Sequence, residues 1–128
     1  MKTLGLIGGT GPESTIDYYR LLTNQYREKA DGASPHIIIN SINLKQMIDW
    51  MGAGELDKVT DELVKQFETL ERAGVDFAAL TANTPHIVFD DLKQRVNLPL
   101  ISIVEATAER AQSLGFKSVA LFGTRYTM

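Results

Sequence analysis

Cysteine is absent from the 128-residue sequence, and this absence limits the chemistry that the chain can perform. Disulfide bonds and thiolate metal ligands are excluded, and so is any reaction in which this chain supplies a thiol. Histidine is scarce as well: His36 and His86 are the only two, and they stand far apart. No set of residues with metal-binding spacing is visible, so we expect no metal site.

Long apolar runs are also missing, and neither sign of charge dominates. No run approaches the ~20 residues that span a bilayer, and the first residues lack the apolar stretch and cleavage site of a signal peptide. The 13 basic and 16 acidic side chains give a net charge of −3 without a basic stripe. We therefore expect neither a membrane nor a nucleic-acid partner. With 44% hydrophobic residues, the composition predicts one ordinary cytoplasmic domain.

Apolar runs alternate with amphipathic segments along the chain. Strand-like runs occupy residues 4–8, 36–40, 75–80, 99–103 and 117–122. Apolar residues three or four apart predict helices over residues 17–30, 44–50, 55–73, 85–96 and 104–114. This alternation predicts an α/β fold: a three-layer parallel sheet of about four strands plus a fifth, with helices on both faces. Ligands of such sheets bind beyond the carboxyl ends of the strands, so the residues that follow each strand are the candidates for function.

A glycine-rich loop, residues 8–15 (GGTGPEST), follows the first predicted strand. Glycines let backbone N–H groups approach an anion, and the helix that follows directs its positive end at the same place. The loop is not a dinucleotide fingerprint, because Ser14 stands where the third glycine of G-x-G-x-x-G belongs and no acidic residue follows the second strand. A Gly-Lys-Ser/Thr phosphate loop is absent too. A tight turn without a ligand stays the alternative.

The segment after the third predicted strand, residues 81–86 (TANTPH), is the most informative. Asn83 and Thr84 offer side-chain donors at a helix start, where free N–H groups also point outward, and such a place suits a carboxylate. A simple N-cap at Thr84 is the alternative. For His86, a lone histidine in a first helical turn, a structural role is favoured over a catalytic one. Glu105, after the fourth strand, would be a general base if buried, but we favour an ordinary first-turn acid.

Three motifs occur in one order along the chain: GLIGGTGPEST at residues 5–15, ANTPH at 82–86 and GTRYTM at 123–128. Together they resemble the aspartate/glutamate racemase family, and the resemblance covers the whole chain. It implies two similar racemase-type α/β domains with the active site in the cleft between them, and no pyridoxal phosphate, metal or other cofactor. It also implies two cysteines on opposite faces of the α-carbon of a small acidic amino acid. One removes the α-proton, and the other delivers a proton from the far side.

Carried over by position, the resemblance places the first catalytic cysteine at Ala82, whose methyl group can neither take nor give a proton. It places binding of the substrate carboxylate at Asn83 and Thr84, and it puts Thr10 in the lining of the cleft. Thr124 follows the fifth predicted strand in the same kind of position as Thr10. We therefore count Thr10, Asn83, Thr84 and Thr124 as the predicted substrate-binding residues.

The resemblance also implies a division into domains. We expect residues 1–115 to be the N-terminal domain of a racemase and residues 116–128 to be the first strand of a truncated second domain. The family's second cysteine lies in a C-terminal half that this sequence does not contain, so the chain is expected to be inactive alone. The orphan fifth strand would pair with a sheet edge of the same chain or of a neighbouring copy, which predicts a homo-oligomer.

Two other functions stay open. One is a non-catalytic binder of small dicarboxylates, which would use the same loop and the same Asn83 and Thr84. The other is an unrelated nucleotide-binding domain, against which the missing third glycine and the missing acidic residue argue.

Overall fold

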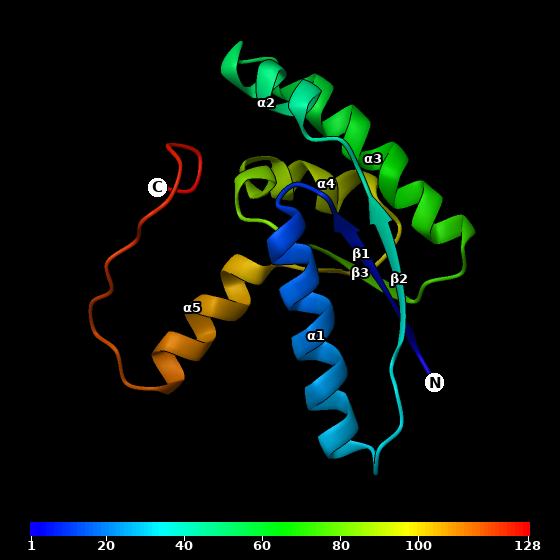
Figure 1. Ribbon diagram of the computed structural model, residues 1–128. Helices are drawn as coiled ribbons and strands as arrows, with labels where there is room; N and C mark the ends of the chain where they lie inside the picture. The colour runs from blue at the N-terminus through cyan, green and yellow to red at the C-terminus, as the bar shows by residue number, and fades with distance from the viewer.

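The computed structural model describes all 128 residues, and at its centre lies a four-stranded parallel sheet (Figure 1). The strands lie in the order β2-β1-β3-β4 and comprise β1 Thr3–Gly8, β2 His36–Ser41, β3 Phe77–Leu80 and β4 Leu100–Ile101. The helices are α1 Pro12–Lys29, α2 Lys45–Gly52, α3 Leu56–Arg72, the 3-10 helix η1 Thr84–Val88, α4 Phe89–Arg95 and α5 Ile103–Ser113. The predicted α/β class and the four-stranded parallel sheet are confirmed.

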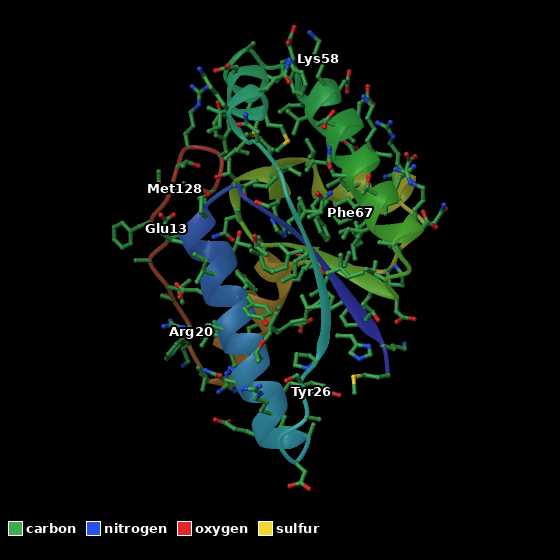
Figure 2. The ribbon with its side chains drawn as sticks, turned by 45° about the vertical axis from the view of Figure 1, so that its right-hand side comes forward. Glu13, Arg20, Tyr26, Lys58, Phe67 and Met128 are labelled. Atoms are coloured by element: carbon green, nitrogen blue, oxygen red, sulfur yellow. The ribbon has the colours of Figure 1, made fainter.

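The core lies between the sheet and α3, whose apolar residues recur every three or four positions and so share one face of the helix. Leu63 and Phe67 are fully buried, and Figure 2 shows Phe67 turned toward the sheet while Lys58 points into solvent. Ile7 and Leu80, from the two central strands, belong to the same buried cluster. Residues of α2 and α4 complete this cluster at its sides.

The opposite face of the sheet carries α1 and α5 and is much more open (Figure 1). Thr15 is the only buried residue of α1, and α5 has none. The sheet is therefore sealed on one face and only partly covered on the other. None of the helices combines the length and the apolar character that a membrane span requires.

Several predicted elements differ from the structure. The predicted helix over residues 85–96 is the 3-10 helix η1 followed by α4, and the predicted strand over residues 99–103 is only Leu100–Ile101. The start of α1 and the fifth strand differ most. α1 begins at Pro12, well before the predicted residue 17, because proline suits the first turn of a helix and that turn faces the loop instead of the core. Residues 117–122 do not form the predicted fifth strand. They join no sheet, and a strand is stable only when its backbone groups pair with a neighbour.

Candidate functional site

The segments that follow β1 and β3 meet at the carboxyl edge of the sheet. These two strands are parallel neighbours, with Ile7 beside Leu80, so the loop 8–11 and the segment 81–84 leave the sheet side by side. The hydroxyl of Ser14 bridges them by donating to the carbonyl oxygen of Thr81 at 2.6 Å. This is the edge at which parallel α/β sheets bind their ligands.

Two glycines of the loop allow this close approach. Gly9 has a φ of +84°, and a Cβ atom on it would lie 2.4 Å from the carbonyl oxygen of Ile42. A Cβ on Gly8 would lie 2.5 Å from Cγ2 of Thr15. The missing side chains thus let α1 begin directly beside the sheet edge and let the segment after β2 pass close to the loop.

Thr15 and Thr81 connect the two segments beneath the surface. Both residues are buried, and their hydroxyl oxygens lie 3.1 Å apart. The backbone N–H of Gly9 donates to Oγ1 of Thr15 at 3.1 Å, and Oγ1 of Thr81 donates to the carbonyl oxygen of Ile7 at 3.2 Å. This pair was not predicted, although each threonine stands within or beside a segment that the sequence marked as functional.

The hydroxyl of Thr10 lies in the same loop without a partner. Its Oγ1 is shielded from solvent and makes no hydrogen bond within the chain. α1 begins with Gly11 as its N-cap, and no side chain caps its first N–H groups. An unpaired hydroxyl beside an uncapped helix N-terminus favours a ligand with anionic oxygens.

The backbone of Ala82 is bound by a side chain of the segment that follows β3. Its carbonyl oxygen lies 2.8 Å from Nδ1 of His86, and because a carbonyl can only accept, Nδ1 carries the proton. The imidazole stacks on Phe89 with ring centroids 4.9 Å apart. Burial lowers the pKa of His86, against an opposing effect of the backbone hydrogen bond to Ala82. A neutral histidine that holds the loop agrees with the structural role favoured from the sequence.

Thr84 and Thr124, both predicted site residues, are brought together. Their hydroxyl oxygens lie 3.4 Å apart, and the hydroxyl of Thr127 is the same distance from that of Thr124. No side chain caps η1, so the alternative of a simple cap at Thr84 is wrong. Asn83 is exposed next to them. Tyr126 packs against the buried cluster and so holds this end of the chain against the domain.

Glu105 serves a different role from the residues at the sheet edge. Ser102 caps α5 by accepting from the backbone N–H of Glu105 at 3.1 Å. The Glu105 carboxylate lies 3.6 Å from the ammonium group of Lys93, and its side chain is 63% exposed. An exposed, ion-paired carboxylate is the ordinary acid of a first helical turn, as the sequence favoured. The structure contains no group of three or more histidine, aspartate or glutamate side chains that could hold a metal ion.

Comparison with known proteins places this fold in a family. The model of the Asp/Glu/Hydantoin racemase family matches residues 7–128. The broad specificity amino-acid racemase RacX of Bacillus subtilis (strain 168) is 31% identical over 130 residues, which cover 98% of this chain and 56% of RacX. A crystal structure from Yersinia pestis, assigned to the Asp/Glu racemases, matches with a TM-score of 0.90 at 35% identity over 99% of this chain and 56% of that chain. An aspartate racemase homologue from Pyrococcus horikoshii OT3 matches with a TM-score of 0.77 at 42% identity, over 90% of this chain and 50% of its own.

The chain spans about half the length of these relatives. The matched region contains the loop after β1, the segment after β3 and the C-terminal threonines, which together form the candidate site. The family model covers nearly the whole chain, and the solved structures share its fold as well as a third or more of its residues. This chain therefore belongs to the Asp/Glu/Hydantoin racemase family.

Proposed function

We propose that this chain is the substrate-binding N-terminal domain of a cofactor-independent amino-acid racemase, that it binds aspartate or glutamate, and that it cannot invert the α-carbon alone. One observation carries the proposal. Ala82 follows β3 at the carboxyl edge of the sheet, where the resemblance implies a catalytic thiol, and the chain has no cysteine at any position. The runner-up is a binder of small dicarboxylates whose parent protein performs no racemisation.

The polar groups near Ala82 support binding of a carboxylate. Thr10 has a hydroxyl without a partner, and the hydroxyls of Thr84 and Thr124 lie 3.4 Å apart. Asn83 adds a side-chain amide at the exposed end of the same segment. Each of these groups can donate to a carboxylate oxygen, and hydrogen bonds to an ionised acceptor are the stronger class. The uncapped N-terminus of α1 contributes a partial positive charge.

The expected lack of activity follows from proton chemistry. Inversion of a weakly acidic α-carbon needs a group on each face that can exchange a proton, together with stabilisation of the carbanion. In this chain one of those positions holds the methyl group of Ala82. His86 donates its Nδ1 proton to the carbonyl oxygen of Ala82, and its proton-accepting Nε2 is buried without a partner, shielded from solvent. Glu105 is exposed and paired with Lys93. The second thiol implied by the resemblance belongs to the half of the relatives that this chain does not span.

Two measurements test the proposal. Calorimetric titration with the L- and D-forms of aspartate and glutamate measures binding, with a nucleotide as the contrasting ligand. Proton NMR in heavy water follows loss of the α-proton signal and so measures exchange at the α-carbon. We expect an acidic amino acid to bind, the nucleotide not to bind, and no exchange above the protein-free background.

Matched variants locate the site. Thr84→Val removes one of the paired hydroxyls and should weaken binding roughly tenfold, the value of one hydrogen bond to a charged group. Thr69→Val makes the same change on an exposed position of α3 and should leave binding unchanged. Absence of binding by all four amino acids would overturn the proposal. Exchange of the α-proton would mean that another group of this chain acts as a base.

We also propose how the protein is organised into domains and copies. Residues 1–115 form one racemase-type domain, and residues 116–128 begin a second. We further propose a cytoplasmic homo-oligomer that acts on a small molecule, with no membrane or nucleic-acid partner. The net charge of −3 and the absence of a basic stripe support the last point.

A further inference from the structure

The buried threonine pair, Thr15 and Thr81, joins the two segments that carry most of the proposed binding residues. Thr15 is 8% exposed and Thr81 is 1% exposed, and the two residues are 66 positions apart along the chain. A hydroxyl is costly to bury unless it forms hydrogen bonds, and both hydroxyls here form them. Neither side chain reaches the surface at which a ligand binds, so the pair can act on a ligand only through its neighbours.

The hydrogen bonds of the threonine pair begin and end at the carboxyl end of β1. The backbone N–H of Gly9 donates to Oγ1 of Thr15 at 3.1 Å, and the two hydroxyl oxygens lie 3.1 Å apart. Thr81 gives its single proton to the carbonyl oxygen of Ile7 at 3.2 Å, so Thr81 accepts where the two hydroxyls meet. The carbonyl oxygen of Gly11, at 3.2 Å, is a second acceptor for Thr15. Hydrogen bonds linked in this way strengthen one another, which favours one geometry of the pair.

Each member of the threonine pair is bonded next to a proposed binding group. Gly9, which donates to Thr15, directly precedes Thr10, whose hydroxyl has no partner in the chain. Thr81 directly precedes residues 82–84, which include the amide of Asn83 and the hydroxyl of Thr84. The distance between the two hydroxyls of the pair therefore helps to set the distance between the two halves of the candidate site.

Other bonds keep the two segments in contact when the threonine pair is broken. The hydroxyl of Ser14 donates to the carbonyl oxygen of Thr81 at 2.6 Å, and the backbone N–H of Thr81 donates to the carbonyl oxygen of Ile7 at 3.0 Å. β1 and β3 also pair in register along their length. Loss of one hydroxyl of the pair should thus leave the fold intact and change only the local geometry of the site.

We propose that Thr15 and Thr81 are positioning residues for ligand binding: their hydroxyl pair holds Thr10 and Thr84 in the arrangement that one acidic amino acid contacts. Binding groups must be held to within about 0.5 Å of their productive positions, and residues behind the site supply that support. The ligand in this inference rests on the proposed function, whereas the link between the two segments can be measured without a ligand.

Valine and serine variants test the positioning role by calorimetric titration. Thr15→Val and Thr81→Val should each weaken binding of the acidic amino acid about fivefold, the value of one neutral hydrogen bond. The double variant should bind no more weakly than either single variant, because both changes break the same link. Thr15→Ser and Thr81→Ser keep the hydroxyl and should bind like the unmodified chain. The matched control is Thr60→Val on α3, where the residue is 2% exposed and its hydroxyl donates to Leu56 within the helix; it should leave the affinity unchanged.

Amide hydrogen exchange measures the link in the absence of a ligand. Thr15→Val should quicken exchange at the amide of Gly9 and also at the amide of Thr81, far along the chain, whereas Thr60→Val should quicken neither. Exchange changes confined to α1 would overturn the proposal, and so would a double variant whose loss of affinity is the product of the two single losses. A loss of affinity in Thr60→Val equal to that in Thr15→Val would also overturn it. If the unmodified chain bound no acidic amino acid while the amides of Gly9 and Thr81 responded together, the link would stand and the proposed function would be wrong.

Discussion

Among single residues, Gly9 carries the strictest steric requirement of the candidate site. A Cβ atom there would lie 2.4 Å from the Ile42 carbonyl oxygen, at a φ of +84°. Gly9→Ala should therefore lower the free energy of unfolding by about 2–4 kcal/mol, since a clash adds to the left-handed strain. Gly54→Ala, at a φ of +76° with no atom within 4 Å, should lose only about 1–2 kcal/mol. Urea denaturation measures both, and equal losses would contradict the close packing of this loop.

His86 is the residue that should make stability depend on pH. Burial holds its pKa below the ordinary value of 6.5, so the unfolded chain takes up this proton at a higher pH than the native chain does. The stability is fully present above the unfolded pKa and falls as the pH drops from about 7 through the lowered native pKa. His86→Asn keeps an N–H donor for the carbonyl of Ala82 and should flatten this fall. Thermal unfolding at a series of pH values tests it, and identical slopes for the two proteins would contradict a buried neutral imidazole.

At the scale of elements, the sequence predicted the helices whose apolar residues recur periodically. It missed the features that depend on contacts with other segments of the chain. α3 was predicted almost to its ends because one apolar stripe faces the sheet. The start of α1 was missed because Ser14 and Thr15 form hydrogen bonds to Thr81 and show no apolar period. Residues 117–122 have the composition of a strand, but composition cannot show whether a neighbouring strand is available for pairing. In the site, the positions after the strands could be predicted, whereas the link between Thr15 and Thr81 depends on how β1 and β3 pack.

α5 should be the helix most dependent on its cap. It has no buried residue to anchor it, and the hydroxyl of Ser102 accepts from the backbone N–H of Glu105 at 3.1 Å. Ser102→Ala should cost about 0.5–2 kcal/mol, and hydrogen exchange should quicken mainly within α5, because local opening of a poorly packed helix precedes global unfolding. Thr107→Ala, an exposed change inside the same helix, should have little effect. Uniformly faster exchange across the sheet would show instead that α5 unfolds only with the whole domain.

At the scale of the whole molecule, the proposed substrate site lies apart from an apolar groove between α1 and α5, which Leu114 and Phe116 help to line. Variants of the two places should separate substrate binding from assembly of the proposed homo-oligomer. Removing residues 123–128 takes away Thr124, whose hydroxyl lies near that of Thr84, but keeps Phe116, which lines the groove. Binding of the acidic amino acid should weaken while the mass of the homo-oligomer stays the same. Leu114→Lys should have the opposite effects, because it changes the groove and leaves every site hydroxyl in place. Titration and sedimentation on the same preparations report the two properties independently. A truncated chain that also became monomeric would mean that the C-terminal residues, and not the groove, hold the copies of the homo-oligomer together.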